Sequence, residues 1–419
     1  MKRVAVIGAG ISGIAAAHLL GARHHVTLIE ASSRLGGHTD THEIPCDGET
    51  LRVDSGFIVF NRPHYPRFNA WLEDLGVASQ PSDMSFGVSD AGAGIEYGTR
   101  NVRALFAQPK NLVDVRFLGM LRDLVRFYRQ RVLPLAPEDG DATLGDYLLR
   151  HRYGAAFREQ HLLPMCAALW SQPIGPAEML PIRHVLSFMA HHGMLSLGRR
   201  PRWRTVVAGS SAYVEAFRQR FHGEILINAT ARSVRREPAC VRVVFDRGER
   251  EFDDVFLACH SDEALALLER PTADERAVLG AMAYRRNRVV VHSDARVMPK
   301  RRAAWSSWNV VSASAARRFA VTYWMNRLQS LQVRPPILVT VDPAMPIDEH
   351  LVYVERTYSH PVFTREALRA QLRKPRIDGA DHVYYCGAYW GWGFHEDGFA
   401  SAVSAVEAHE AREETHRAA

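Results

Sequence analysis

Short runs of consecutive apolar residues recur along this chain, and the segments between them follow a different pattern. The runs Val4–Ile7, Val26–Ile29 and Val255–Cys259 are typical of strands that are buried on both faces of a parallel sheet. Small and apolar residues over Ile14–Leu20 and Phe399–Ala408 predict helices that pack on such a sheet. The pattern therefore predicts an α/β fold.

The turn between the first strand and the first helix has the sequence Gly8-Ala9-Gly10-Ile11-Ser12-Gly13. In such a turn the first glycine permits a tight bend, the second lets the backbone approach a pyrophosphate, and the third lets helix and strand pack closely. Free N–H groups at the helix start, aided by the helix dipole, face the phosphates. Glu30 ends the second predicted strand, where a carboxylate can bind ribose hydroxyls. We expect a dinucleotide site that includes Gly8, Gly10, Ile11, Ser12, Gly13, Glu30 and Ala31.

The motif continues as Glu30-Ala31-Ser32-Ser33-Arg34-Leu35-Gly36-Gly37. An arginine followed by two glycines suits a loop around a second phosphate, which a flavin dinucleotide needs and most NAD enzymes do not. With this extension the chain resembles the flavin amine oxidase superfamily, which includes monoamine oxidases, protoporphyrinogen oxidases and carotenoid desaturases. The resemblance implies FAD, with Glu30 on the adenosine ribose and Arg34, Gly36 and Gly37 near the pyrophosphate and ribityl chain. Cys386 raises the question of a covalent flavin, but a small buried strand residue is the favoured interpretation, so we expect non-covalent FAD.

The predicted strands and the resemblance together divide the chain into two interleaved lobes. We expect a discontinuous, Rossmann-type cofactor lobe formed by residues 1–75, 205–260 and 381–419. Residues 76–204 and 261–380 are richer in aromatic residues and arginine, and we expect them to form an α+β substrate lobe. By the resemblance, Asp54, Ser55, Gly56 and Phe57 approach the flavin, and the backbone of Val234 contacts adenine. An ordinary turn and an ordinary strand residue are the alternative interpretations.

The stretch Tyr384–Phe399 is the second distinctive motif. In the resembling enzymes a strand ending in Gly-Asp or Gly-Glu contacts the ribityl chain; here Gly387 matches, but Ala388 replaces the acid. We expect Asp397 to supply that carboxylate, or else to cap the last helix, and Gly398 and Phe399 to present N–H groups to the flavin. A substrate wall is expected from Tyr389, Trp390, Trp392, Phe394, Trp170 and Tyr323, although core packing is the alternative.

His395 and Glu396 are the titratable pair that the resemblance places nearest the flavin, and they are the candidate catalytic residues. A histidine tuned near neutral pH could take a proton while hydride leaves the adjacent carbon. Hydrogen bonding of His395 to backbone is the alternative. The sequence shows no charged pocket for a primary amine, and no lysine placed to hold a water at flavin N5 as amine-oxidising members of the resembling superfamily do.

Composition narrows the remaining functions. Five scattered cysteines without a CxxC pair, and twenty histidines without an HExxH motif, argue against a metal and favour a cytoplasmic chain. The net charge of +6 comes mostly from arginine. The sequence has no dense basic stripe and no recognisable nucleic-acid-binding motif, so no nucleic-acid partner is expected. The start Lys2-Arg3 followed by apolar residues mimics a signal peptide, but three spaced glycines plus Glu30 favour the cofactor fold.

Residues Leu112–Leu133 combine helically spaced apolar residues with five arginines. This pattern fits either a basic helix lying on a membrane or a helix packed on its own core with solvated arginines. The full-length pattern resembles a bacterial subgroup associated with modification of cyclopropane, methyl-branched and furan fatty acids. The expected activity is FAD-dependent removal of hydride and a proton from an apolar substrate, chiefly a methylated acyl chain of a membrane lipid. The alternatives are an amine, porphyrinogen or carotenoid oxidase, and a non-redox acyl isomerase; the electron acceptor is unknown.

Overall fold

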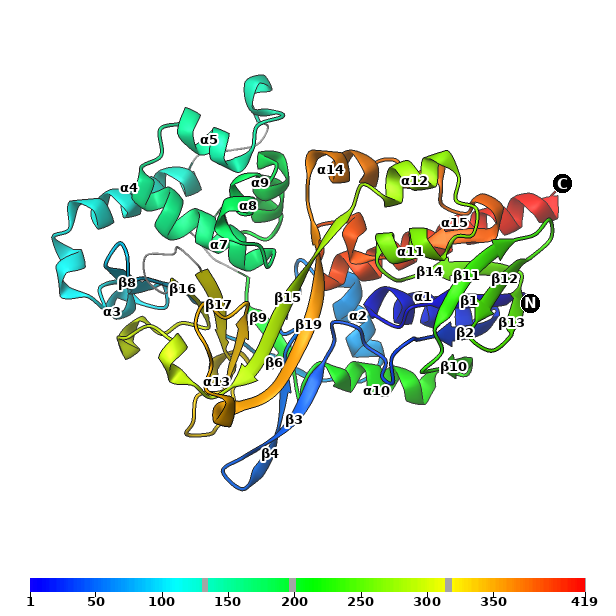
Figure 1. Cartoon of the computed structure of the whole chain (residues 1–419), viewed down its shortest axis with the longest axis horizontal. Helices are drawn as coiled ribbons and strands as arrows, with labels where there is room; N and C mark the ends of the chain where they lie inside the picture. The colour runs from blue at the N-terminus through cyan, green and yellow to red at the C-terminus, as the bar shows by residue number, and fades with distance from the viewer. Residues whose placement is uncertain (130–134, 196–200, 313–318, 419) are drawn as a thin grey trace.

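The computed structural model describes residues 1–129, 135–195, 201–312 and 319–418. Figure 1 shows two lobes, with the cofactor lobe carrying both ends of the chain and the substrate lobe at the opposite end. The chain passes between the lobes several times, as its segment order requires.

The cofactor lobe is built on a parallel five-stranded sheet in the order β10-β2-β1-β14-β20. Its strands come from widely separated parts of the chain: β1 (Arg3–Ile7), β2 (His25–Ile29), β10 (Glu224–Leu226), β14 (Asp254–Leu257) and β20 (Val383–Tyr385). Every one of these strands except β10 is almost entirely buried, because both faces of the sheet are covered. The predicted parallel sheet, with its discontinuous segments, is confirmed.

Alternation along the strands sends side chains to two separate cores. Val4 and Val6 lie in one core with four helices: α1 (Ile11–Gly21), α2 (Pro66–Asp74), α10 (Ser211–Arg220) and α15 (His395–Ala418). Ala5 and Ile7 lie in the other core. That core is closed by α11 (Ser261–Leu267), α12 (Ala273–Leu279), α14 (Arg365–Gln371) and a second sheet of β11 (Ala231–Arg236), β12 (Val241–Phe245) and β13 (Glu249–Phe252). The three helices lie in the segment 261–380 that was expected to form the substrate lobe, but they pack on the parallel sheet and therefore belong to the cofactor lobe.

The substrate lobe is built on a seven-stranded sheet in the order β19-β15-β18-β17-β16-β7-β8. Its strands are β7 (Phe86–Asp90), β8 (Ile95–Gly98), β15 (Ala283–His292), β16 (Trp308–Ser312), β17 (Phe319–Trp324), β18 (Leu338–Val341) and β19 (Val352–Val362). The pairs are antiparallel except β7 with β16. The long strands β15 and β19 pair over almost their whole length and run from the cofactor lobe into the substrate lobe (Figure 1).

Helices cover one side of this sheet and bury many aromatic side chains. They are α3 (Val102–Leu105), α4 (Val115–Arg129), α5 (Leu144–Arg150), α6 (Ala155–Phe157), α7 (Leu163–Leu169), α8 (Ile174–Glu178) and α9 (Ile182–His191). The predicted helix at Leu112–Leu133 is α4, which is shorter; residues 130–134 lie outside the described residues. Its Phe117, Met120 and Phe127 are buried in the lobe.

Two small sheets connect the lobes. One is the hairpin of β3 (Thr41–Cys46) and β4 (Glu49–Asp54), and the other joins β5 (Phe60–Asn61), β6 (Ser79–Pro81) and β9 (Trp203–Val206). Strand β4 ends at Asp54. The chain leaves the hairpin there, and Ser55–Val59 becomes part of a cavity wall.

Candidate active site

One cavity of about 710 Å³ extends from the glycine turn of the cofactor lobe into the substrate lobe. Its wall includes residues of both lobes and of all three cofactor-lobe segments. The charged residues in this wall are Glu30, Arg232 and Glu263, and all three lie in the cofactor lobe. The wall is therefore polar at one end and mainly apolar and aromatic at the other.

The glycine turn has the geometry that a pyrophosphate cradle requires. Gly8 has a φ of +99°, and a Cβ on Gly13 would lie 1.8 Å from the Gly8 carbonyl oxygen, so both positions need glycine for the protein's own packing. A Cβ on Gly10 would meet nothing within 4 Å. Gly10, Ile11 and Ser12 line the cavity, so the open space at Gly10 belongs to it.

Glu30 lies at the cavity wall where β2 ends. Its carboxylate accepts hydrogen bonds from the backbone N–H groups of Ala9 (2.9 Å) and Ser32 (2.8 Å), which fixes it beside the glycine turn. Ala31, Gly36 and Gly37 also line the cavity. The Arg34 side chain instead turns into its own loop, where it donates to the carbonyl oxygens of Thr39 (3.0 Å) and Gly37 (2.9 Å). Arg34 is absent from the cavity wall, so it shapes the loop rather than lining the site.

Asp54 is also placed differently from the expected flavin contact. It is fully buried outside the cavity wall and accepts hydrogen bonds from the N–H and hydroxyl of Ser210, from Thr41 Oγ1 (2.5 Å) and from Gln329 Nε2 (3.0 Å). Burial raises the pKa of this carboxyl to about 6. Asp54 therefore ties the hairpin to the start of α10. The next three residues, Ser55, Gly56 and Phe57, do line the cavity.

Val234, the expected adenine contact, does not line the cavity. Val234 is buried in the core, and its carbonyl accepts a hydrogen bond from Glu269 N–H (3.1 Å). The cavity is lined instead by Ala229, Thr230, Ala231 and Arg232. The entry of β11, three residues earlier than expected, therefore faces the cavity.

The C-terminal motif divides between cavity wall and core. Gly387, Tyr389, Trp392 and Phe394 line the cavity, as do Trp170 and Tyr323 of the substrate lobe. Trp170 Nε1 donates to the Trp392 carbonyl (3.2 Å), which joins the two aromatic walls. Trp390 is the exception: it is absent from the wall and packs on Tyr389, with ring centroids 4.8 Å apart.

Asp397, Gly398 and Phe399 lie behind the wall rather than in it. Asp397 accepts a hydrogen bond from Phe394 N–H (2.9 Å) at the start of α15, and burial raises its pKa to about 7. A Cβ on Gly398 would lie 2.8 Å from Ile11 Cγ2, because α15 crosses α1 closely here. The helix-capping alternative describes Asp397, and Gly398 is needed for helix packing.

The two candidate catalytic residues have separate environments. His395 lines the cavity, stacks on Phe57 with ring centroids 3.5 Å apart, and shares hydrogen bonds with Thr39 Oγ1 (3.0 Å) and Tyr213 OH (3.1 Å). Burial lowers its pKa to about 3, so it is neutral at pH 7 and a poor proton acceptor. Glu396 is absent from the wall and accepts hydrogen bonds from the N–H groups of Arg67 and Phe68, which caps α2.

Several polar residues of the cavity wall were not predicted from the sequence. His38, His260, His360, Tyr284 and Tyr358 all line the cavity. The His38 ring lies 5.3 Å from that of His360 and 6.0 Å from that of His260. Burial lowers the pKa of His38 and of His360, the latter to about 4. Within the described residues, the buried His38 Nε2 has no hydrogen-bond partner. The only sequence feature that pointed to His38 was its position directly after Gly37, at the end of the extended glycine motif.

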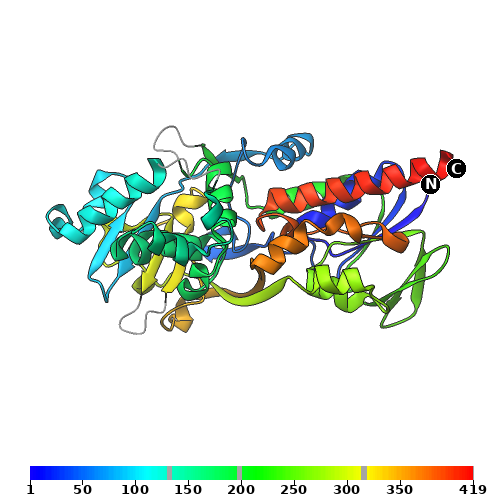
Figure 2. The ribbon, with the colours of Figure 1, turned by 90° about the horizontal axis from the view of Figure 1, so that it is seen from above.

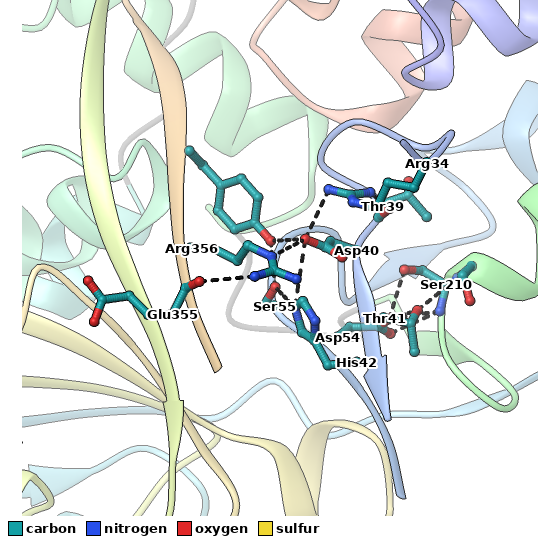
Figure 3. Close-up of polar contacts among 12 residues, drawn as sticks. Arg34, Thr39, Asp40, Thr41, His42, Asp54, Ser55, Ser210, Glu355 and Arg356 are labelled. Atoms are coloured by element: carbon teal, nitrogen blue, oxygen red, sulfur yellow. Dashed lines mark hydrogen bonds and ion pairs between the residues drawn. The ribbon is translucent and has the colours of Figure 1, made fainter. Parts of the chain in front are cut away.

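A buried carboxylate organises the back of this wall (Figure 3). Asp40 contacts Arg34 Nη2 (2.9 Å), Arg356 Nε (3.2 Å) and the hydroxyl of Tyr358 (2.8 Å). The Tyr358 hydroxyl also bonds to Ser55 Oγ (2.5 Å). The network therefore joins the cofactor loop to β19 of the substrate lobe and fixes two wall residues.

Two further features bear on cofactors. Cys386, which could have suggested covalent flavin, is fully buried outside the cavity wall, and burial raises its thiol pKa to about 12. Among the described residues, His24, His409 and Glu413 are close enough to share a metal ion. Two of these three residues already have charged partners: Glu413 lies 3.4 Å from Lys2 Nζ, and His409 donates a hydrogen bond to Asp254.

The cavity fits a flavin dinucleotide. The cradle at Gly10 is open only toward the cavity, Glu30 stands beside it, and the wall continues to the glycines and aromatic residues of the C-terminal motif. The unpartnered His38 Nε2 is a polar atom that a bound polar group could satisfy.

Comparison with known proteins agrees with this geometry. Residues 11–304 match the family described as flavin containing amine oxidoreductase. The chain belongs to this family. It is a flavin-dependent oxidoreductase with the amine oxidase fold, as the resemblance predicted.

The solved structures confirm the fold over the whole chain. A protein provisionally assigned as a protoporphyrinogen oxidase, from Exiguobacterium sp. 255-15, has a TM-score of 0.72 at 16% identity and covers 98% of this chain and 99% of its own. A fatty acid isomerase from P. acnes that produces CLA has a TM-score of 0.70 at 15% identity, over 97% and 98%. Putrescine oxidase bound to putrescine has a TM-score of 0.66 at 16% identity, over 98% and 99%.

Curated relatives match over shorter stretches. An L-amino-acid oxidase from Pseudechis australis is 54% identical over 48 residues, which is 11% of this chain and 9% of the relative. A flavin-dependent L-tryptophan oxidase from Lentzea aerocolonigenes is 31% identical over 124 residues, or 29% and 26% of the two chains. The matched stretches thus span only a small part of these relatives. Among the described helices, none combines the length and the apolar character that crossing a membrane requires.

Proposed function

We propose that this flavin-dependent oxidoreductase uses non-covalently bound FAD to remove hydride and a proton from an apolar substrate, a methylated fatty acyl chain of a membrane lipid. The observation that supports it is the distribution of charge in the cavity. Every charged wall residue of the described chain lies in the cofactor lobe, while the substrate-lobe end is lined by Trp170, Trp308, Tyr323 and aliphatic residues.

An apolar wall favours an apolar ligand because nothing there compensates the desolvation of an ammonium or carboxylate. In the described wall of the substrate lobe no aspartate, glutamate, lysine or arginine is present to pair with a charged amine or amino acid. The histidines of the wall include His360 and His395, whose pKa values burial lowers to about 4 and about 3. They are neutral near pH 7 and add no positive charge.

The chain's own residues have distinct proposed tasks. Gly10 and Glu30 hold the dinucleotide end, and the aromatic rings of Trp392, Phe394 and Tyr323 orient the acyl chain and exclude water. Bound flavin would supply a two-electron acceptor for the hydride. The hydride would pass to the flavin and the proton to solvent, and a carbon–carbon double bond forms between the two adjacent carbons that they leave. The neutral His395, hydrogen-bonded to Thr39 and Tyr213, orders the wall beneath Phe57 and takes no proton.

Two other activities remain as alternatives. An amine, porphyrinogen or carotenoid oxidase would share the fold, as putrescine oxidase does. A non-redox acyl isomerase has support from the fatty acid isomerase of similar fold, which acts on an acyl chain. The apolar wall suits an acyl chain in either reaction, so the flavin must be followed directly.

Anaerobic mixing of the flavin-loaded protein with methylated phospholipid tests the proposal. We expect the flavin absorbance to bleach and an acyl product with one more double bond to appear. Bleaching by putrescine or tyramine, with none by the phospholipid, would refute the lipid substrate. Isomerised product without bleaching would identify the isomerase instead. Trp170→Phe keeps an aromatic ring but removes the pyrrole part of the indole and its hydrogen bond to Trp392, and it should loosen acyl binding without altering the flavin content.

A further inference from the structure

One segment of the substrate lobe is strongly basic. Residues 100–129 contain seven arginine or lysine residues and two aspartates, a formal charge of +5, whereas the whole chain carries +6. This segment comprises α3, the short helix Pro109–Leu112 and α4.

The same segment exposes large apolar side chains. Val102 is 73% exposed, Val113 78% and Val115 81%, and Leu112 and Leu118 are 58% and 41% exposed. In the described residues, these five make up a large share of all exposed large hydrophobic side chains. Single exposed apolar residues are ordinary, but four within seven residues form a patch. We call the five residues the apolar tip.

The two sides of α4 explain why the tip is exposed. Phe117, Met120 and Phe127 face the lobe core and are buried, so the opposite side of the helix faces solvent. Val115 and Leu118 begin this outer side, and Arg122 and Arg129 continue it. Packing of this helix on the core of its own lobe thus explains only its inner side. The outer side has no partner within the described chain.

The outer side of α4 also contains a basic hollow. Arg122, Val125, Arg126 and Arg129 line it. The two aspartates of the segment do not neutralise it fully: Asp114 accepts hydrogen bonds from the N–H groups of Arg116 and Phe117, and Asp123 is 97% buried and accepts from Gly154 N–H. Arg122 stays 82% exposed although it lies 3.6 Å from Asp123.

Figure 1 and Figure 2 show where this surface lies. The segment containing α3 and the beginning of α4 forms the end of the molecule farthest from the two chain termini. It is consequently free to meet a flat surface without interference from the cofactor lobe.

We propose that the apolar tip and the arginines of α4 form a docking surface for an anionic lipid bilayer. The valines and leucines would enter the interface, and Arg122, Arg126 and Arg129 would contact lipid phosphates. A nucleic acid would use the arginines but has no use for five exposed aliphatic side chains, so lipid fits both features. The inference rests on the proposed function and deepens it, because it names the surface by which the protein would meet the membrane that contains its substrate.

Vesicle sedimentation of the flavin-loaded, full-length protein tests this surface without any turnover. We expect binding to vesicles of equal parts phosphatidylcholine and phosphatidylglycerol, and much weaker binding to phosphatidylcholine alone. Raising the salt should reduce the electrostatic part, because the Debye length falls from about 10 Å at 0.1 M to about 3 Å at 1 M. Equal binding to both vesicles, or to neither, would overturn the proposal.

Variants separate the two parts of the surface. Val113→Asp combined with Val115→Asp should weaken vesicle binding by at least about tenfold. Arg122→Ser combined with Arg129→Ser should weaken it about 30-fold, since each basic residue near such a membrane contributes about a fivefold factor. The matched controls are Leu372→Asp, at a side chain that is 84% exposed in the cofactor lobe, and Arg247→Ser with Arg270→Ser, at exposed positions there.

The controls should bind vesicles like the wild type. Loss of binding in the controls as large as in the tip variants would overturn the assignment of this surface. Salt-sensitive binding to duplex DNA, with no binding to vesicles, would identify a nucleic-acid partner instead and equally overturn it. Vesicle binding is measured apart from flavin bleaching, so a docked protein that fails to oxidise lipid would refute only the proposed function.

Discussion

Replacing Gly10 by alanine is expected to separate cofactor binding from folding. An added Cβ at Gly10 meets no protein atom within 4 Å, and the backbone there has φ −74° and ψ −177°, which alanine adopts readily. We therefore expect the free energy of unfolding of the flavin-free protein to change by no more than about 0.5 kcal/mol.

The affinity for FAD should fall sharply in the same variant. The new methyl group would occupy the open side of the turn and hold the pyrophosphate away from the N–H groups of the α1 start. A hydrogen bond to a charged group contributes about 1.5–3 kcal/mol, so losing one should weaken binding about 10- to 150-fold. Titrating FAD into flavin-free protein and following the quenching of flavin fluorescence gives this dissociation constant.

Two comparison variants make the result specific. Gly13→Ala would place a Cβ 1.8 Å from the Gly8 carbonyl oxygen, so both stability and affinity should fall. Gly175→Ala adds a Cβ that also meets nothing within 4 Å but lies outside the cavity wall, and both quantities should stay unchanged. Wild-type FAD affinity in Gly10→Ala would refute the placement of the pyrophosphate on the open side of this turn.

Three further predictions concern side chains whose hydrogen-bond and ion-pair partners the structure identifies. Burial lowers the pKa of folded His395 to about 3, so its contribution to stability is complete above pH 6.5 and is lost as the pH falls. Between pH 7 and pH 5 the loss is about 2 kcal/mol; urea unfolding of His395→Gln should show a drop smaller by that amount, and an equal drop would contradict it. Glu396→Ala removes the acceptor for two N–H groups at the start of α2 and should cost about 1–2 kcal/mol, while the bleaching rate of the flavin-loaded fraction stays unchanged. A large loss of that rate at normal stability would instead make Glu396 catalytic. Asp40→Asn should cost about 2 kcal/mol of stability, a value discounted because Arg34 and Arg356 are partly exposed. Asp246→Asn, in a solvent-exposed pair with Arg232, should leave the melting temperature nearly unchanged; similar thermal shifts in both would show that the Asp40 network adds nothing.

The features that could be predicted from sequence are those set by local spacing. The strand, glycine turn and helix of residues 3–21 follow one another directly, so their geometry depends on neighbours only a few positions away. Alternation within β1 likewise determines which side chains enter which core. The C-terminal aromatic motif was placed at the cavity because glycines interrupt it, and most of its rings do line the wall.

The features that were misplaced depend on contacts between distant segments. The donors to Asp54 are Ser210 and Gln329, more than 150 residues away, and Glu396 caps a helix that begins 330 positions earlier in the chain. Ala231 lines the cavity and Val234 does not, because the register of β11, which its pairing with β12 determines, turns Val234 into the core. A short-range pattern contains no information about such pairings. His38 was missed for a related reason, since its neighbours His260 and His360 come from two other segments.

The paired strands β15 and β19 have a mechanical consequence. Their ladder of hydrogen bonds runs from one lobe into the other, and Tyr284, Val289, Tyr358 and His360 on it form part of the cavity wall. Swinging the lobes apart on a hinge would require this ribbon to bend or break along with the other crossings of the chain. Passage of a large ligand should therefore depend on rotation of individual rings such as Trp392 and Phe394, and its rate should respond to their size more than to solvent viscosity.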